Sequence, residues 1–121
     1  MAGIWNIDAN PVHQGAEYEV TLYYLAPGAD PSNPEAGPHI DLTGCAVEMR
    51  VKPVGKSAFT LSATQIAIVD APSGKVRLHL LSSETDDYRW ELGQHEIYII
   101  WPGNVRKLWL EGTFRVNREL E

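Results

Sequence analysis

The chain has 121 residues, a single cysteine and a formal net charge of −6 at pH 7. This length is typical of one domain with its own core, and we expect residues 1–121 to form one. Its ten basic residues are scattered along an acidic chain, which argues against nucleic-acid binding. No apolar run is long enough for a membrane helix, and residues 1–8 lack a secretory signal pattern, so neither membrane insertion nor export is expected.

The first twelve residues are interpreted as an N-terminal arm, residues 1–12. The segment Ile4-Trp5-Asn6-Ile7 is apolar and precedes the first well-marked strand. It either packs on its own domain as a first strand or docks on a neighbouring molecule. Ile4, Trp5 and Ile7 are therefore candidate interface residues.

A half-buried strand is predicted over residues 17–25, where apolar and polar side chains alternate. Residues 26–39 follow, with four prolines and two glycines that interrupt both helix and strand. Loops of this length are usually functional or mobile. We therefore add Pro31 and Pro34 to the candidate interface residues.

The next strand, residues 45–52, alternates so that Cys45, Val47, Met49 and Val51 share one side. One face of this strand is predicted to be packed and the other wet, with Cys45 as a small buried side chain. Short strands are predicted at 59–61, 66–69 and 76–80.

Residues 82–90 break the alternation and predict one helical turn, capped by Ser83, between two sheets. Tyr88, Trp90 and Leu92 are expected to cover one end of the core. A strand beginning at Gly93-Gln94 and ending at Trp101 then turns at Pro102-Gly103-Asn104 into a strand over 107–116, which is a hairpin signal. About seven such strands predict an all-β, immunoglobulin-like antiparallel β-sandwich with one short helical turn.

The chain has four tryptophans, and one of them breaks its strand pattern. Trp109 is out of phase with Leu108 and Leu110, so either the indole or the leucines face away from the main core. Outward aromatic side chains form protein interfaces or platforms on which sugars stack. We favour a protein interface and include Trp109 among the candidate interface residues.

No catalytic chemistry is predicted. The four histidines, His13, His39, His79 and His95, lack a recognisable metal-ligand spacing, and His79 and His95 are expected to be solvent-facing polar residues of strands. Nucleophile and phosphate-binding motifs are missing from the sequence. We predict no enzyme, no metal and no cofactor.

An ordered series of short motifs nevertheless suggests a family. The motifs are Ile4-Trp5-Asn6-Ile7, Gln14-Gly15-Ala16, Asp41-Leu42-Thr43-Gly44, Met49-Arg50-Val51-Lys52, Gly74-Lys75-Val76, Gly93-Gln94-His95-Glu96-Ile97-Tyr98 and Leu110-Glu111-Gly112-Thr113-Phe114-Arg115-Val116. In order and spacing they resemble small virion proteins of tailed bacteriophages and the N-terminal domain of siphophage baseplate upper proteins. The resemblance implies a structural or adaptor protein of a tail, baseplate or neck, which binds other virion proteins in symmetric copies. Its expected location is the virion, assembled in the cytoplasm of the bacterial host.

Two departures limit what this resemblance transfers. Family members usually have an aromatic residue at the position of Cys45 and a shorter connection in place of residues 26–39, so no binding surface is carried over. Two other functions stay open. One is a carbohydrate-binding module for host-surface glycans, with Trp101 or Trp109 stacking on sugar rings, and the other is a capsid decoration protein.

Overall fold

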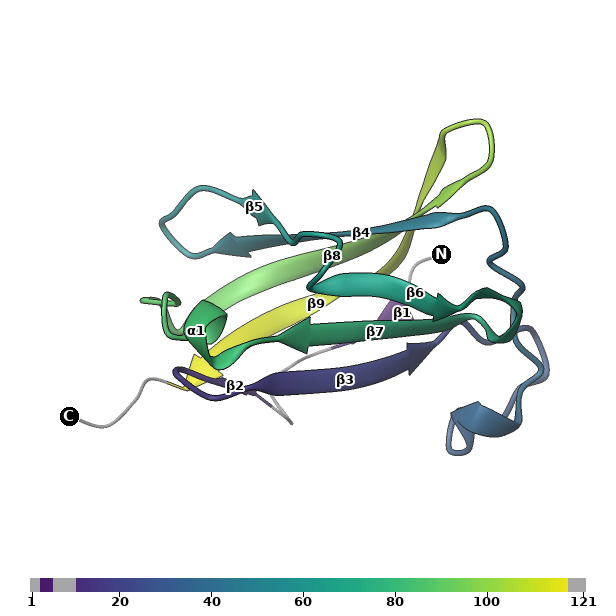
Figure 1. Cartoon of the computed structure of the whole chain (residues 1–121), viewed down its shortest axis with the longest axis horizontal. Coiled ribbons are helices and arrows are strands. Elements are labelled where there is room, and N and C mark those ends of the chain that lie inside the picture. The colour runs from purple at the N-terminus through teal and green to yellow at the C-terminus, as the bar shows by residue number, and fades with distance from the viewer. Residues whose placement is uncertain (1–2, 6–10, 118–121) are drawn as a thin grey trace.

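The protein is a sandwich of two β-sheets in a computed structural model that describes residues 3–5 and 11–117 (Figure 1). The strands are β1 Gly3–Ile4, β2 Val12–His13, β3 Tyr18–Tyr23, β4 Ala46–Pro53, β5 Phe59–Thr60, β6 Ile66–Asp70, β7 Lys75–Leu80, β8 Leu92–Trp101 and β9 Val105–Asn117. The helical elements are the α-helix α1 Ser82–Thr85 and two short 3-10 turns, η1 Pro34–Ala36 and η2 Ala71–Ser73.

The strand order is that of an immunoglobulin-like sandwich. The larger sheet runs β1-β9-β8-β4-β5, with β2 also paired to β9, and the smaller sheet runs β3-β7-β6. The sets β9-β8-β4 and β3-β7-β6 correspond to the two sheets of that fold. The predicted all-β class and the short helical turn are confirmed. The two N-terminal strands differ from the rest because they pair with β9 in parallel.

The core lies between the sheets and is built from alternate residues of the strands. On β4, Met49 and Val51 are fully buried, while Arg50 and Lys52 are exposed on the outer face. This is the alternation expected of a strand with one packed face and one wet face. Cys45 precedes β4 and is only partly buried against the core. Burial, with a smaller contribution from the Asp41 carboxylate, raises the pKa of its thiol.

Helix α1 links the smaller sheet to the larger one, as predicted, but its cap differs from the prediction. Ser83 does not cap the helix; the Glu84 carboxylate instead accepts a hydrogen bond from the Leu81 N–H at 2.8 Å. The buried Thr85 hydroxyl donates to the Ala16 carbonyl at 2.8 Å. This bond fixes the helix against the segment that leads into β3.

Aromatic side chains close one end of the core. Phe59, Tyr88, Trp90 and Phe114 form one group, with ring centroids 5.3–6.3 Å apart. Burial of Tyr88 and Trp90 at this end is confirmed, but Leu92 is 41% exposed, because it lies on the outer side of β8. Among the described residues no helix is long and apolar enough to cross a membrane.

Candidate functional site

The N-terminal segment packs on its own domain at the edge of β9. The Trp5 N–H donates to the Glu111 carbonyl at 2.8 Å, and the Trp5 carbonyl lies 2.6 Å from Nε2 of His95. His95 is directly opposite Gly112, which presents no side chain on the face that the imidazole occupies. The ring therefore has room to reach Trp5, whose indole meets it edge-on at 5.2 Å.

This contact corrects the prediction that His95 faces solvent. The residue is 1% exposed, because it lies on the inner side of β8 with Ile97 and Ile99. A carbonyl only accepts, so Nε2 carries the proton, and Nδ1 has no hydrogen-bond partner among the described residues. Burial lowers the pKa of His95, against smaller opposing effects of Trp5, Glu111 and Glu96.

Of the N-terminal candidates, Trp5 is thus partly buried and Ile4 pairs through its backbone with Glu111. Ile7 lies outside the described residues. Residues 3–5 therefore match the first of the two alternatives for the arm, in which it packs on its own domain as a first strand.

The proline-rich loop, residues 26–39, is closed at its base. Its ends are joined by a hydrogen bond from the Ala26 N–H to the Pro38 carbonyl at 2.9 Å. Pro34 begins the turn η1, and its carbonyl lies 2.6 Å from Nε2 of His39. Pro31 is exposed and Pro34 is partly buried. Pro31 is consequently the more accessible of the two predicted interface prolines.

The structure corrects the expected exposure of Trp109. Its indole is 9% exposed and stacks on Tyr24, with ring centroids 5.1 Å apart and planes inclined by 5°. A shift of register between Ile97 and Tyr98 of β8 opposes one extra residue of β9, which allows both Trp109 and Leu110 to pack toward the core. Trp109 is therefore a core residue and offers little surface to a partner or a sugar.

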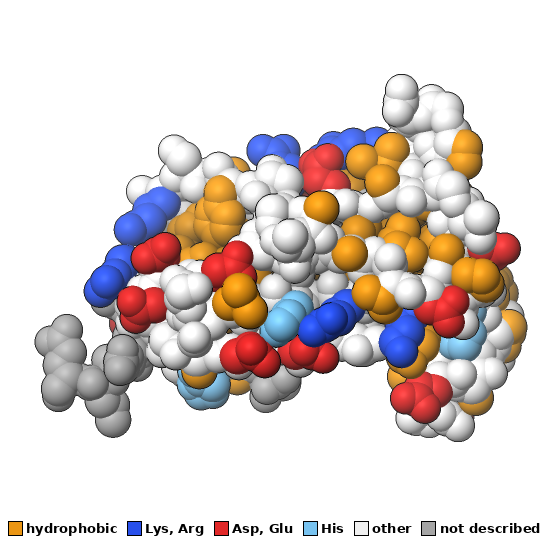
Figure 2. Space-filling view, in the orientation of Figure 1, with side chains coloured by type: hydrophobic (Ala, Val, Ile, Leu, Met, Phe, Trp, Pro, Cys, Tyr) orange, Lys and Arg blue, Asp and Glu red, His pale blue; other side chains and the backbone are white. Residues whose placement is uncertain are grey.

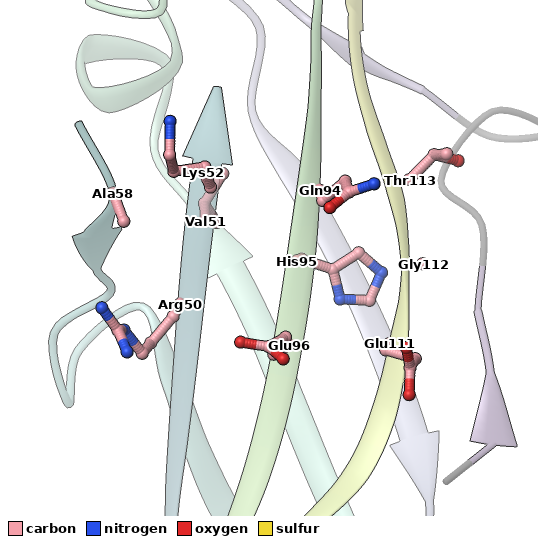
Figure 3. Close-up of a pocket in the computed structure, with 10 residues that line it drawn as sticks. All are labelled: Arg50, Val51, Lys52, Ala58, Gln94, His95, Glu96, Glu111, Gly112 and Thr113. Carbon is pink, nitrogen blue, oxygen red and sulfur yellow. The ribbon is translucent and has the colours of Figure 1, made fainter. Parts of the chain in front are cut away.

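The outer face of the larger sheet carries a shallow groove of about 480 Å³ across β4, β8 and β9 (Figure 3). Two cross-strand rows line it. Lys52 is opposite Gln94, which is opposite Thr113; Arg50 is opposite Glu96, which is opposite Glu111. The groove can hold a polar ligand or a polar side chain of another protein.

The two glutamates of this groove are on adjacent strands, and Figure 3 shows their carboxylates directed apart. Glu96 and Glu111 are cross-strand neighbours, an arrangement that is unfavourable for like charges. Figure 3 shows the Arg50 side chain directed away from Glu96, and no ion pair joins them among the described residues. Farther along the same face, Arg106 pairs with Glu48 at 2.7 Å and lies over the Tyr98 ring at 3.5 Å.

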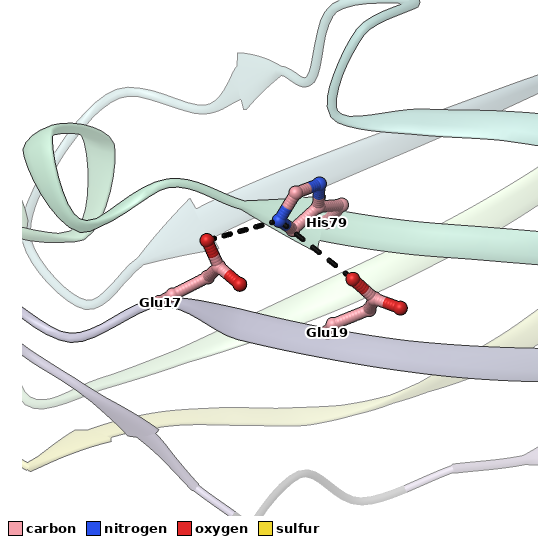
Figure 4. Close-up of side chains that lie close together, drawn as sticks. All are labelled: Glu17, Glu19 and His79. Carbon is pink, nitrogen blue, oxygen red and sulfur yellow. Dashed lines mark ion pairs between the residues drawn. The ribbon is translucent and has the colours of Figure 1, made fainter.

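A second polar cluster lies on the outer face of the smaller sheet (Figure 4). Nε2 of His79 on β7 is 3.4 Å from a Glu17 carboxylate oxygen and 3.8 Å from one of Glu19. The Arg77 guanidinium donates to Glu19 at 2.9 Å and to Nδ1 of His79 at 3.0 Å. Figure 2 shows this face as a mixture of acidic, basic and histidine side chains over β3 and β7.

Two glutamates and a histidine are a possible ligand set for a divalent metal, but Arg77 makes this set unsuitable as it stands. A guanidinium only donates, so Nδ1 of His79 is an acceptor and the proton of the neutral ring is on Nε2. That nitrogen, which faces both carboxylates, then has no lone pair for a metal. We interpret the cluster as charge neutralisation on the sheet surface.

The outer edge of β3 was not predicted as a site. The smaller sheet ends at β3, which pairs with β7 on one side, and no described residue pairs with its other side. The sequence did mark β3 as a half-buried strand, but its place at the edge depends on strand order, which alternation does not reveal. Neither the groove nor the charge cluster has a local motif that would have identified it.

No family model matches the chain, and no curated protein shows significant similarity to it.

Proposed function

We propose that this protein is a non-enzymatic structural adaptor of a bacteriophage virion, in the tail or baseplate, which assembles in several symmetric copies and binds other virion proteins. The proposal derives from the sequence resemblance. The observation that supports it best is that the motifs carrying this resemblance have structural roles in the sandwich.

The motif Asp41-Leu42-Thr43-Gly44 illustrates such a role. The Asp41 carboxylate accepts hydrogen bonds from the N–H and hydroxyl of Thr43, at 2.9 and 2.6 Å. Leu42 is fully buried, and Gly44 has a φ of 81°, a conformation that favours glycine. The motif is a turn that fixes the entry into β4.

The motif Gly74-Lys75-Val76 has a similar role before β7. Gly74 has a φ of 60°, and a Cβ there would lie 2.7 Å from the Ile40 carbonyl oxygen. Glycine is therefore needed for two reasons, backbone conformation and space. Motifs of this kind specify a scaffold, which agrees with a protein that offers contact surface to its neighbours.

Mass spectrometry and cryo-electron microscopy of purified particles test the proposal. We expect the chain in tail or baseplate density, at a copy number that matches the local symmetry. Its absence from the particles would refute the proposal, and density on the head would instead identify a capsid decoration protein.

The carbohydrate-binding alternative is weakened by the position of Trp109. A buried indole stacked on Tyr24 has no free face for a sugar ring, and Trp101 is itself partly buried beside Tyr24. A glycan array with the purified protein separates the two functions. A specific sugar signal would favour the module, whereas its absence agrees with the adaptor.

A further inference from the structure

The outer edge of β3, with which no described residue pairs, differs from the sheet edges at β6 and β5. Strand β6, at the opposite edge of the smaller sheet, has an irregular register between Ile68 and Asp70, and β5, at the edge of the larger sheet, is only two residues long. Irregular and short edge strands resist the addition of a further strand. Strand β3 pairs with β7 without a register shift over Tyr18–Tyr23 and contains no proline or lysine.

The direction of the peptide groups on β3 follows from its pairing. The Tyr24 N–H donates to the Gly74 carbonyl at 2.8 Å, which continues the ladder between β3 and β7. In an antiparallel ladder every second residue directs its N–H and C=O to the same neighbour. Tyr18, Val20 and Leu22 therefore bond to β7, and the peptide groups of Glu19, Thr21 and Tyr23 point outward.

Charge on this edge is partly compensated. An acidic edge usually repels a second acidic edge, but Arg77 neutralises Glu19 through a contact of 2.9 Å. The imidazole of His79 lies between Glu17 and Glu19. Arg77 on the neighbouring strand thus compensates Glu19, the one acidic residue of β3.

We propose that β3 pairs in antiparallel orientation with β3 of a second copy, about a two-fold axis at Thr21, so that the two smaller sheets form one continuous sheet. The outward peptide groups at 19, 21 and 23 are symmetric about Thr21, so both copies donate and accept equally. In this register Glu19 is opposite Tyr23 of the other copy, and no glutamate faces a glutamate. A register centred on Glu19 would place the two Glu19 side chains against each other.

This inference deepens the proposed function, on which it rests for the expectation that copies meet in an assembly. Few residues take part, so the dimer is expected to be weak in solution and strengthened by the assembly. Its test uses purified protein and does not depend on the particle. If purified protein shows no β3 dimer, the proposed adaptor function is unaffected. If the chain is absent from particles, the adaptor function is refuted and the dimer result is unaffected.

Disulfide cross-linking tests the register. Opposed residues of a hydrogen-bonded antiparallel pair have Cα atoms about 5.5 Å apart, which suits a disulfide. In a Cys45→Ser background, Thr21→Cys should give a covalent dimer on mild oxidation. Thr60→Cys is the matched control, an exposed threonine on another edge strand, and should stay monomeric. Equal cross-linking by both variants, or none by Thr21→Cys, would overturn the proposal.

Sedimentation equilibrium provides an independent test. Thr21→Pro removes an outward N–H without removing a bond to β7, so the variant should fold and remain monomeric where the wild type dimerises. Thr21→Val retains the N–H and should dimerise like the wild type. Circular dichroism and thermal unfolding verify that both variants are folded. A wild type that is monomeric at every concentration, or a dimer that persists in Thr21→Pro, would contradict pairing through β3. If the wild type is monomeric and the β3 edge is needed only for incorporation into particles, then β3 binds another protein and not a second copy.

Discussion

The outer edges of β9 and β3 differ in what pairs with them. The outer edge of β9 is covered by the chain's own N-terminal strands, β1 and β2, which pair with it in parallel. The outer edge of β3 has no partner among the described residues. In an immunoglobulin-like sandwich the first strand commonly lies in the sheet that contains the strand equivalent to β3. Here the described N-terminal strands belong to the other sheet, and among the described residues only β7 pairs with β3.

This difference separates stability from assembly. The β9 side carries the N-terminal docking and buried contacts, so substitutions there should lower the free energy of unfolding. The outward side of β3 carries exposed side chains, so substitutions there should change association with little effect on folding.

Phe114→Ala on β9 should be the most damaging change. The ring is fully buried and contacts Tyr88, Trp90 and His95. Truncating a buried phenylalanine lowers the free energy of unfolding by about 3–5 kcal/mol. Chemical denaturation measures the loss. Lys107→Ala, an exposed change on the same strand, is the control and should stay within about 0.5 kcal/mol of the wild type.

His95→Ala should release the N-terminal strand from β9. It leaves the Trp5 carbonyl without the donor now at 2.6 Å, which costs about 1–3 kcal/mol if no water replaces it. His95→Gln retains an N–H donor and should lose less. Amide hydrogen exchange at Trp5 should accelerate in His95→Ala. Unchanged exchange would show that β1 is held by its backbone pairing with β9 alone.

The stability of the protein should decrease as the pH falls below about 6.5, the ordinary pKa of histidine. Burial lowers the pKa of His95 in the folded state, so the unfolded chain takes up a proton first and is favoured. The loss should continue until the pH reaches the lower pKa of the folded state.

Unfolding free energies measured across this range, for the wild type and His95→Gln, test this effect. The variant should have a smaller pH dependence, because Gln does not titrate. His79→Gln, a change on the outer face of β7, is the control. If both variants had the slope of the wild type, His95 would not be responsible for the loss.

Arg77→Met should have the smallest effect on stability. The Arg77 and Glu19 side chains are 42% and 47% exposed, and ion pairs of such exposure contribute about 0.2–1 kcal/mol. Its effect on association should be larger, because Glu19 is no longer neutralised at the edge of β3. Sedimentation equilibrium should then show a weaker dimer. A dimer of unchanged strength would mean that Arg77 has no role in pairing.

The strands of the sandwich were predictable because their signals are local. Alternation identified β4 and β7, and the turn Pro102-Gly103-Asn104 identified the hairpin of β8 and β9. The Asn104 backbone, with a φ of 63°, has the left-handed conformation that such turns favour. The entry into β4 was equally evident, because the Asp41 side chain bonds to Thr43, two residues away.

What the sequence did not reveal depends on contacts between distant segments. The bulge that buries Trp109 is a property of the pairing of β8 with β9, and the hydrogen-bond partner of His95 is Trp5, ninety residues earlier, although its inward side follows from alternation with Ile97 and Ile99. The free edge of β3 depends on the strand order of the whole sheet. Periodicity along one segment contains none of this information.

Residue-resolved amide hydrogen exchange by NMR, at low and high protein concentration, shows whether the outer edge of β3 is open in the monomer and paired in the dimer. In dilute solution the amides of Val20 and Leu22, bonded to β7, should be protected, and those of Glu19, Thr21 and Tyr23 should exchange rapidly. At high concentration these three amides should become protected as two β3 strands pair. Protection of Glu19, Thr21 and Tyr23 in the dilute monomer would show that the chain covers this edge itself, and would contradict the account.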